Sequence, residues 1–374
     1  MSFGDWVDGQ LDTLRAADQW REFRTFDALG PRGNLDGRSV ISFASNDYLG
    51  LSHHPAVIAA AQDALARWGA GATSSRHVVG HRPAHQDLEE ALAEWKGTVR
   101  ALTFSSGFAV NLGVLATFGG PDCLIASDEL NHASIIDGCR LSRSTIAVAR
   151  HNDVDHVAEI LESRSLPRAI VIADAVFSMD GDEAPVDKLA IVCRDHDAML
   201  VLDEAHSVFG TDLSTSANMP GLSLLRVATL SKTLGAMGGA VCGSASHIEL
   251  LINRCRPLIF STGLSPATAA AAHAAIDVVR SQEGEQRLAH LRKIVDRLRP
   301  GHVSPIVPIM VGAEAAALDA AQSLLDEGIL VPAIRPPTVA PGTARLRVAL
   351  SSDHTHDDVD HLIEALTRLG LQGS

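Results

Sequence analysis

Lys232 is the side chain whose surroundings most directly indicate chemistry. It follows the apolar run Val227–Leu230, which predicts a strand, and a glycine-rich stretch comes after it. Thr229, Ser231 and Thr233 place hydroxyl groups around it, which favours an anion nearby. Three interpretations of Lys232 follow from these residues: a surface lysine, a phosphate ligand, or an amine that forms a Schiff base.

Asp203 stands at the end of a second predicted strand, Met199–Leu202. Open α/β sheets bind ligands at the edge where their strands end, so this strand would deliver the carboxylate to a binding site. A carboxylate buried there needs a cationic partner, although an aspartate in this place also suits a helix N-cap or a structural ion pair. His206 follows three residues later and shares the site if the chain turns back.

Ser106, Gly107 and Phe108 follow a third predicted strand, Ala101–Phe104, and open an apolar helical stretch. Glycine lets backbone N–H groups approach an anion, and the N-terminus of a helix adds a partial positive charge. An ordinary strand-to-helix turn would have the same pattern. The sequence has no P-loop and no GxGxxG fingerprint, since Gly69–Gly71 lacks the third glycine, so nucleotide-triphosphate and nicotinamide sites lose their main support.

Two further turns place polar side chains at strand ends. His132 lies in the run Asn131–Ser134 after a short apolar run. Its imidazole would be able to stack on an aromatic cofactor, but a histidine in a loop is also commonly structural. The run Ala175–Gly181, which contains Ser178, predicts a tight turn after the strand Ala169–Ala173.

Four potential metal ligands recur at intervals of four residues: His77, His81, His85 and Glu89. On a continuous helix this spacing would align them on one face. Pro83 interrupts such a helix, and no pattern of supporting residues accompanies the four, so no metal site is expected.

The elements that must position these residues alternate between short apolar runs and helical patterns from about residue 100 onwards, which predicts parallel βαβ units. Because the strands are apolar throughout, helices should cover both faces of the sheet. The clearest helix is Ala84–Trp95, and residues 1–24 predict a separate amphipathic helix. A smaller α+β unit is expected over residues 301–373. Its strands and helices are Ile306–Val311, Arg345–Leu350, Ala315–Glu327 and Asp357–Leu369.

Composition limits the class of protein. The chain of 374 residues is 46% hydrophobic and 20% charged, which supports a large packed core, and its formal net charge is −14. This charge argues against nucleic acid or an anionic membrane as partner. The five cysteines are scattered without a CxxC pair, and neither a signal peptide nor a membrane-spanning run is recognised. We therefore expect a cytoplasmic protein without a disulfide scaffold.

Taken together, these segments resemble the α-oxoamine synthases, a family of fold-type I pyridoxal-phosphate enzymes, over nearly the whole chain. The motifs that carry the resemblance are Asn46–Leu51, Ser106–Phe108, Asn131–Ser134, Phe177–Gly181, Asp203–His206 and Ser231–Lys232. The resemblance implies an N-terminal helical segment over 1–42, a large, mainly parallel α/β domain over 43–270 that binds pyridoxal phosphate, and a smaller C-terminal α+β domain over 271–374. The sequence departs from the family pattern at Thr73–Ser75, at Asp174, which replaces a common glutamate, and beside Lys232, where flanking glycines are often seen.

The resemblance also implies a role for each matching residue. Lys232 would carry pyridoxal 5'-phosphate as a Schiff base, and Asp203 would pair with the ring nitrogen. His206 would hydrogen-bond the ring hydroxyl oxygen, and His132 would stack on the ring. The further cofactor contacts implied are Ser106, Gly107, Phe108, Ser178, Thr229 and Ser231.

Assembly and substrates follow from the same resemblance. Ser261 and Thr262 match a segment that reaches the phosphate site of a neighbouring subunit, which implies a homodimer with shared active sites. The runs Arg15–Arg21 and Ile334–Arg347 resemble the members that join L-alanine to a pimeloyl thioester, carried by coenzyme A or by acyl carrier protein, with loss of CO2. The substrate contacts implied are Arg21, Asn46, His132, Thr338 and Arg347.

Arg347 would bind the amino-acid carboxylate, with Arg345 on the same strand face as its alternative. Arg21 would meet the distal carboxylate of the pimeloyl chain. Two rival interpretations stay open: a family member that uses glycine or serine, and a pyridoxal-phosphate-binding protein without catalytic activity.

Overall fold

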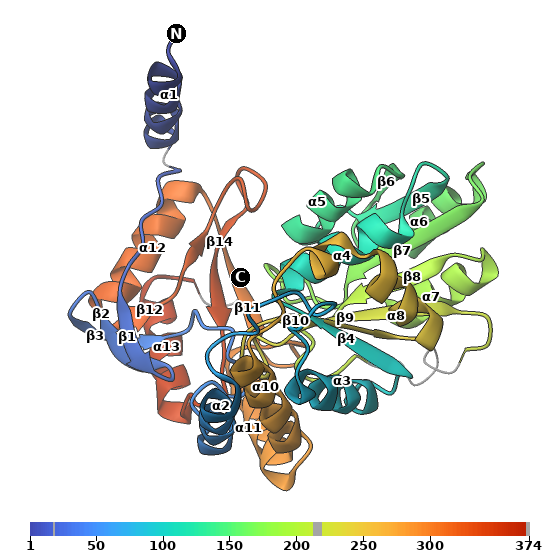
Figure 1. Cartoon of the computed structure of the whole chain (residues 1–374). Coiled ribbons are helices and arrows are strands. Elements are labelled where there is room, and N and C mark those ends of the chain that lie inside the picture. Colours follow the sequence, from blue (N-terminus) through green and yellow to red (C-terminus); the bar gives the residue numbers. More distant parts are fainter. Residues whose placement is uncertain (18, 212–218, 372–374) are drawn as a thin grey trace. The chain divides into compact units, whose positions relative to one another are not determined.

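The computed structural model describes residues 1–17, 19–211 and 219–371. Contacts divide the chain into two units (Figure 1). The large unit comprises Ser45–Val307 and Ala349–Val359. The small unit comprises Met1–Ala44, Pro308–Val348 and Asp360–Ser374, so both ends of the chain contribute to it.

A seven-stranded sheet forms the centre of the large unit, in the order β4-β10-β9-β8-β7-β5-β6. β10 runs antiparallel to both of its neighbours, and the remaining pairs are parallel. The strands are β4 (Arg100–Phe104), β5 (Cys123–Asp128), β6 (Thr145–Ala149), β7 (Arg168–Asp174), β8 (Met199–Asp203), β9 (Ser223–Thr229) and β10 (Gly239–Gly243). The expected large, mainly parallel α/β sheet is therefore confirmed.

Alternate residues of these strands enter two separate apolar cores. Ile170 and Ile172 of β7 join the first core, whereas Val171 and Ala173 join the second. The first core packs against α4 (Gly107–Phe118), α5 (Ala133–Ser142) and α8 (Ala245–Arg254). The second packs against α6 (Val154–Glu162) and α7 (Val186–Asp195). Helices therefore cover both faces, as the uninterrupted apolar runs predicted.

A further group of helices completes the large unit. α10 (Pro266–Val279) packs against α2 (Pro55–Trp68) and α3 (Pro83–Trp95). The expected helix Ala84–Trp95 is α3, which buries Leu88 and Leu92. Pro83 occupies its first turn, where the missing N–H costs nothing. The remaining helices are the short α9 (Arg256–Ile259) and α11 (Gln282–Leu298).

The small unit contains two small sheets. One has the order β1-β2-β3-β12, and the other has the order β11-β14-β13. Their strands are β1 (Phe26–Leu29), β2 (Arg32–Leu35), β3 (Arg38–Ser42), β11 (Ile306–Gly312), β12 (Ile329–Leu330), β13 (Ala333–Ile334) and β14 (Ala344–Ala349). The helices are α1 (Phe3–Ala16), α12 (Glu314–Asp326) and α13 (His356–Arg368). The expected strands and helices of the C-terminal α+β unit are all present.

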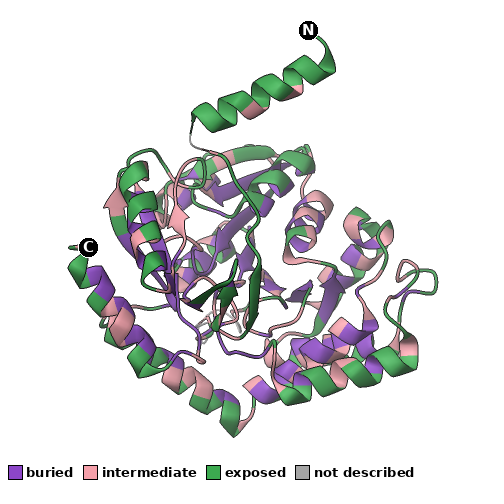
Figure 2. Ribbon diagram, turned by 90° about the vertical axis from the view of Figure 1, so that its left-hand side faces the viewer, coloured by how far each residue is buried: buried purple, intermediate pink, exposed green. Residues whose placement is uncertain are grey.

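The N-terminal segment differs from its prediction. The helix expected over residues 1–24 ends at Ala16, and the rest of the segment 1–42 is not helical, because β1, β2 and β3 form an antiparallel meander. Gly30 and Gly37, with φ of 78° and 87°, close its two turns. Figure 2 shows α1 exposed along nearly its whole length, and none of its residues is buried.

The division into units also differs from the predicted domain boundaries. α10 continues through residue 270, and its packing on α2 and α3 keeps residues 271–307 with the large unit. The pairing of β3 with β12 joins residues 1–44 to the C-terminal part of the chain. Neither long-range contact leaves a mark in the local sequence pattern.

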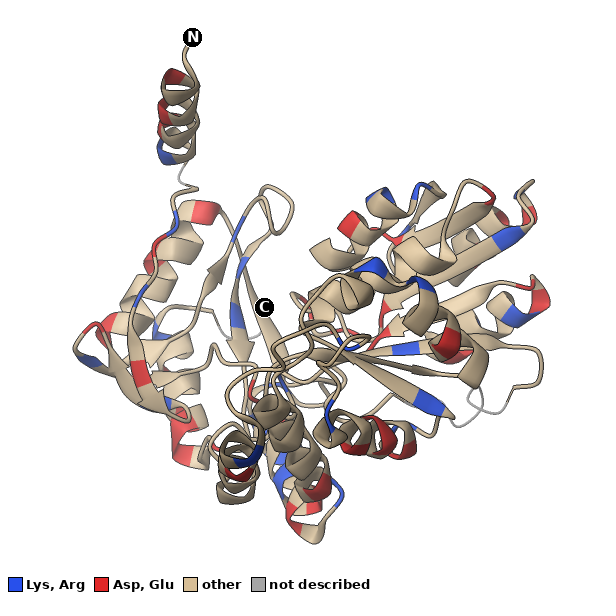
Figure 3. Cartoon of the chain, viewed as in Figure 1, with Lys and Arg blue, Asp and Glu red and all other residues tan. Residues whose placement is uncertain are grey.

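Charged residues of both signs occur in each unit (Figure 3). All five cysteines are buried and free. Within the described ranges, no helix combines the length and the apolar character that crossing a bilayer requires.

Candidate active site

The carboxyl ends of β7, β8 and β9 bring the predicted chemical residues to one edge of the large sheet. Asp174 and Asp203 are register partners on β7 and β8, and Asp203 is also paired with Val227 on β9. Lys232 follows the end of β9 by three residues. The strand-end position predicted for Asp203 and Lys232 is therefore where the structure has them.

A chain of hydrogen bonds links Lys232 to His206 and Tyr48. Lys232 Nζ lies 2.8 Å from His206 Nε2, and His206 Nδ1 lies 2.6 Å from the Tyr48 hydroxyl. That hydroxyl donates its proton to Asn46 Oδ1 at 3.1 Å. Because the hydroxyl has one proton to donate, His206 Nδ1–H is the donor to it, and Nε2 accepts from Lys232. The chain thereby favours one tautomer of His206 and orients its Nε2 to accept a hydrogen bond from the lysine.

Asp203 is buried and receives two hydrogen bonds. Asn111 Nδ2 donates to Oδ2 at 2.6 Å, and the Ala205 backbone N–H donates to Oδ1 at 3.0 Å. Asn111 lies on α4 and also donates to Ser134 Oγ at 2.9 Å. These donors hold a negative carboxylate in place in a largely apolar setting.

His132 is the N-cap of α5, and its backbone N–H donates to Asp174 Oδ2 at 2.9 Å. Its Nδ1 lies 2.7 Å from Ser134 Oγ, and its ring meets Phe108 edge-on. Burial lowers the pKa of His132, and the nearby Lys232 lowers it further against the opposing effect of Asp203. The imidazole is therefore neutral at neutral pH.

Asp174 is the second buried carboxyl at this edge. Burial raises its pKa well above the ordinary value, and the negative charge of Asp203 raises it further. The hydrogen bond from His132 works in the opposite direction but is outweighed. Asp174 therefore favours its protonated form more than an exposed aspartate does, and it anchors the backbone of His132.

The junction between β4 and α4 has features that suit an anion. Ser106 caps α4 by accepting the Ala109 N–H at 3.1 Å. A Cβ added to Gly107 would lie 3.5 Å from the side chain of Thr229, so the two strand ends are in close proximity. Thr229 Oγ1 is in turn 2.9 Å from Ser231 Oγ. A helix N-terminus beside two hydroxyl groups is suited to a phosphate.

The remaining predicted site residues lie on other segments of the chain. Ser178 lies in the turn that follows β7. Ser261 and Thr262 are exposed in the segment after α9. Arg21, Thr338 and Arg347 belong to the small unit, where Arg347 is buried on β14 and Arg21 is exposed between α1 and β1. Asp18, part of the Arg15–Arg21 motif, lies outside the described residues.

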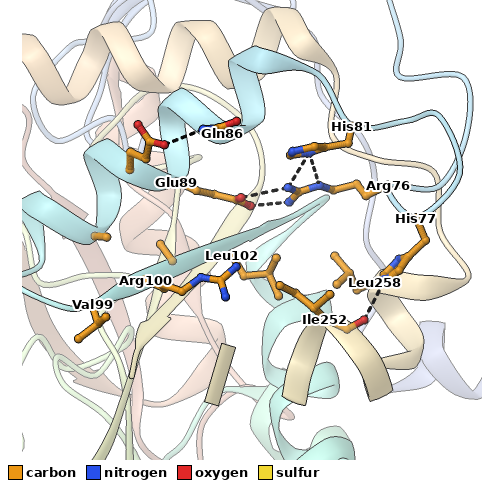
Figure 4. A pocket seen from close by; sticks show the side chains of 13 residues that line it. Arg76, His77, His81, Gln86, Glu89, Val99, Arg100, Leu102, Ile252 and Leu258 are labelled. Atoms are coloured by element: carbon orange, nitrogen blue, oxygen red, sulfur yellow. Dashed lines mark hydrogen bonds and ion pairs between the residues drawn. The ribbon is translucent and has the colours of Figure 1, made fainter. Parts of the chain in front are cut away.

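The four residues spaced by four are occupied with other contacts, and His77, His81 and Glu89 are labelled in Figure 4. Glu89 forms an ion pair with Arg76, and His81 Nδ1 lies 2.9 Å from the same guanidinium. His77 and His85 contact the backbone carbonyls of Ile252 and Leu264. His77, His81 and Glu89 line a cavity of about 430 Å³. Across the part of the chain that the structure describes, no group of three His, Cys, Asp or Glu side chains is arranged to hold a metal ion.

Sequence reasoning assigned no role to Asn111, Tyr48 or Ser134. Asn111 is a buried amide in the largely apolar helix α4, and a buried amide there signals a hydrogen-bonding partner. Tyr48 lies in the motif Asn46–Leu51, from which we singled out only Asn46. Both residues could be noticed in the sequence, but the sequence does not show which residue each one contacts.

The sheet order of the large unit, together with a small unit made from both ends of the chain, is the architecture of the fold-type I transferases. Residues 38–366 match the aminotransferase class I and II family, and the chain belongs to this family and, within it, to the α-oxoamine synthases.

Its relatives and structural neighbours are similar over nearly their full lengths. The 8-amino-7-oxononanoate synthase of Anaeromyxobacter dehalogenans is 43% identical over 97% of this chain and 94% of that protein. That of Methylorubrum extorquens is 45% identical over 91% of this chain and 90% of that protein. A serine palmitoyltransferase from S. paucimobilis, solved with PLP and myriocin, is 28% identical with a TM-score of 0.91, covering 99% of this chain and 98% of that one. The 8-amino-7-oxononanoate synthase of Francisella tularensis is 27% identical with a TM-score of 0.72, covering 88% and 98%.

Proposed function

We propose that the protein catalyses the pyridoxal-phosphate-dependent condensation of L-alanine with a pimeloyl thioester, giving 8-amino-7-oxononanoate, CO2 and a free thiol in biotin biosynthesis. The observation that carries the proposal is the convergence of Lys232, His206 and Asp203 at one sheet edge. Relatives that share 43–45% of its residues over nearly the whole chain bear the name of this activity.

The site fits pyridoxal 5'-phosphate at three points. The N-terminus of α4, with the hydroxyls of Thr229 and Ser231, suits its phosphate. The buried carboxylate of Asp203 suits a protonated ring nitrogen, since a buried negative charge is stabilised by a cation. The amine of Lys232 suits its aldehyde. When bound, the cofactor supplies an electron sink for the pair of electrons left at the α-carbon of the amino acid.

The chain's own residues would orient the cofactor and move the protons. Asp203, held by Asn111, would favour a protonated ring nitrogen. Lys232 would anchor the cofactor, and its amine, when free, would take the α-proton of the amino acid as a general base. His206 is oriented by Tyr48 to accept a hydrogen bond from the lysine, so the amine is held in position. Neutral His132 offers an uncharged face for stacking.

Two arginines are assigned to the carboxylates of the substrates. A carboxylate that leaves water needs a charged partner, and arginine offers two parallel donors. We assign the alanine carboxylate to Arg347 of β14 and the distal pimeloyl carboxylate to Arg21. Asn46, Thr338 and His132 complete the proposed substrate contacts.

The proposal includes a homodimer in which Ser261 and Thr262 contribute to the partner's phosphate site. Their exposed position in the segment after α9 is consistent with such a contact. The acyl group is carried by coenzyme A or by acyl carrier protein, and the proposed location is the cytoplasm.

A second candidate function is another α-oxoamine synthase reaction, such as those of serine palmitoyltransferase, 2-amino-3-ketobutyrate ligase or 5-aminolevulinate synthase. The structural likeness to serine palmitoyltransferases, at a TM-score of 0.91, favours it. The higher sequence identity to the 8-amino-7-oxononanoate synthases, 43% against 28%, favours alanine and a pimeloyl donor. A cofactor-binding protein without activity is the alternative of a different class.

A thiol-release assay separates these candidates. L-alanine, glycine and L-serine are each combined with pimeloyl, palmitoyl, acetyl and succinyl thioesters, and free thiol and CO2 are measured. We expect alanine with a pimeloyl thioester to give the highest kcat/KM and the Lys232→Ala variant to give none. Faster release with glycine or serine assigns the second candidate, and no release with any pair refutes an enzymatic role.

A further inference from the structure

Outside the residues assigned so far, one histidine of the large unit is placed between two carboxylates. His151 follows β6, and its Nδ1 lies 3.0 Å from Asp128 Oδ1 at the end of β5. Its Nε2 lies 2.8 Å from Asp182 Oδ2, in the segment after β7. A carboxylate oxygen only accepts, so both ring nitrogens must carry a proton for both bonds to form. The geometry therefore describes an imidazolium between two negative charges.

The charges around His151 agree with this reading. Burial alone would lower the pKa of His151, but the hydrogen bonds and charges of Asp128 and Asp182 outweigh burial and raise it. Glu129 accepts the backbone N–H of His151 through Oε1 at 2.9 Å, which adds a third carboxylate. Asp182 also acts on the pKa of His302, which burial lowers, and His302 Nε2 contacts the Ile306 carbonyl at 2.6 Å.

The neighbouring cations have partners of their own. Arg150 pairs with Asp153 at 2.8 Å. Arg292, which acts on the pKa of Glu183, lies with its guanidinium over the ring of Phe209. The groups that face the imidazole ring from β5 and from the segment after β7 are therefore acidic, and they stabilise its protonated form.

His151 contacts the turn that carries Ser178. This turn, Phe177–Asp182, is closed by two backbone bonds: Gly181 N–H to Phe177 O at 2.8 Å and Phe177 N–H to Asp182 O at 3.0 Å. The ring of Phe177 stands edge-to-face to the ring of His151, with centroids 4.4 Å apart at 85°. Thus the His151 ring packs against Phe177, the first residue of the turn, and forms an ion pair with Asp182, the last.

Asn152 reinforces the same attachment. Its Nδ2 donates to Asp182 Oδ2 at 2.8 Å and to the Glu183 carbonyl at 3.2 Å, while its backbone N–H donates to Asp128 Oδ2 at 2.8 Å. The connection between β6 and α6 is thus bonded on one side to the end of β5 and on the other to the turn. Of these bonds, only those of the His151 ring depend on a proton that titrates near neutral pH.

We propose that His151 is a positioning residue that, as an imidazolium bridging Asp128 and Asp182, holds the Phe177–Asp182 turn, and with it Ser178, against the ligand edge of the sheet. The part played by Ser178 as a cofactor contact rests on the proposed function; the attachment of the turn does not. Deprotonation leaves one ring nitrogen able to donate, so one of the two carboxylates loses its hydrogen bond from the imidazole and the attachment of the turn is weakened.

The sign of the pH effect follows from the raised pKa. The stabilisation is fully present below the ordinary histidine pKa of 6.5 and is lost as the pH rises through the higher pKa of folded His151. Losing one charge-assisted hydrogen bond should make local opening of the turn about 10-fold more frequent.

The test uses the full-length protein without cofactor, so that its failure is separate from failure of the thiol-release assay. Hydrogen exchange of the Phe177–Asp182 amides is measured from pH 5 to 9 and corrected for intrinsic rates. The pKa of His151 is read from its imidazole resonances. We expect protection of the turn to fall about 10-fold through that pKa, while the amides of β8 show no such step. A pKa of His151 at or below 6.5, or protection without a step, overturns the proposal.

Variants supply the second arm. His151→Gln keeps an amide donor for one carboxylate but none for the other, so the turn should exchange fast at every pH. Asp182→Asn removes the charge on the turn's side and serves where His151→Gln fails to fold. His196→Gln makes the same substitution at the C-cap of α7 and should retain the wild-type pH profile. A wild-type profile in both His151→Gln and Asp182→Asn refutes the positioning role.

Discussion

Glu204→Gln tests whether a buried ion network holds the strand end that carries Asp203 and His206. Glu204 directly follows Asp203, and its side chain is 0% exposed. Lys96 Nζ lies 2.8 Å from Oε2, and Arg226 places Nε 2.8 Å and Nη2 2.6 Å from Oε1. Lys96 and Arg226 are only 9% and 11% exposed. Water therefore cannot replace the carboxylate once it is gone.

The expected cost is large because two cations stay behind. The glutamine amide offers one acceptor oxygen and turns an NH2 group toward a positive charge. Breaking a buried pair by removing one partner costs about 3–5 kcal/mol, since the remaining charge is left without compensation. Burial alone would raise the pKa of Glu204, but Lys96 and Arg226 outweigh burial and hold the pKa below its ordinary value of 4.5. The contribution is therefore present above pH 4.5 and is lost as the pH falls through the lower folded value.

Urea unfolding at pH 7 measures this effect. Tryptophan fluorescence is a suitable probe, because Lys96 Nζ lies 4.4 Å from the centroid of the Trp95 ring. The matched control is Glu249→Gln, whose pair with Arg100 is 61% and 44% exposed and should contribute less than about 1 kcal/mol. A free-energy change for Glu204→Gln no larger than that of the control would refute the reasoning. So would a difference between variant and wild type that stays constant from pH 7 down to pH 3.

Three further outcomes are expected. Borohydride reduction of the enzyme with pyridoxal phosphate should fix the cofactor on the peptide that contains Lys232; recovery on another lysine removes that assignment. Asp203→Asn should slow exchange of the alanine α-proton by about 100-fold or more. Asp174→Asn should change it by less than about 10-fold, because burial and the charge of Asp203 raise the pKa of Asp174 and favour its neutral form. Equal losses would show that the charge of Asp174 matters as much as that of Asp203. Arg347→Ala should weaken alanine binding by about 10- to 150-fold. Arg21→Ala should leave alanine binding unchanged and should raise the KM for the pimeloyl thioester more than the KM for a methyl-ended thioester of equal length. Equal effects of Arg21→Ala on both acyl donors would refute its contact with the distal carboxylate.

The large sheet and its ligand edge could be predicted from the sequence because strands covered on both faces are apolar throughout. Met199–Leu202 is such a run, and the first polar residue after it, Asp203, falls at the strand end. The same reasoning placed Lys232 after β9. A local pattern was enough, since both the strand and its end are local features.

The N-terminal meander could not be predicted in this way. β1 is exposed at all four positions, and β2 buries only Leu35, so neither strand shows the alternation that marks a half-buried strand. The pairing of β3 with β12 joins residues nearly 290 apart in sequence. Only the glycines at 30 and 37 gave a local signal, and they indicate turns without naming the strands on either side.

The orienting residues of the site were missed for a related reason. Tyr48 reaches His206 across 158 residues of sequence, and Asn111 reaches Asp203 across 92. Asn111 is a polar side chain in a largely apolar helix, and Tyr48 follows the polar run Ser45–Asp47. Which partner each finds is decided by the order of the strands and helices in space, which the local patterns leave open.

The division of charge between Asp174 and Asp203 shows the same limit at the level of chemistry. Both aspartates end apolar strands, and the two are register partners on neighbouring strands. Their local sequence patterns therefore do not show which of them pairs with the cofactor. A negative charge on one buried carboxyl disfavours a second negative charge beside it. Asp203 receives the Asn111 amide and the Ala205 N–H, and its charge in turn raises the pKa of Asp174. The carboxyl that α4 supports with Asn111 therefore disfavours ionisation of Asp174, which holds the backbone of His132.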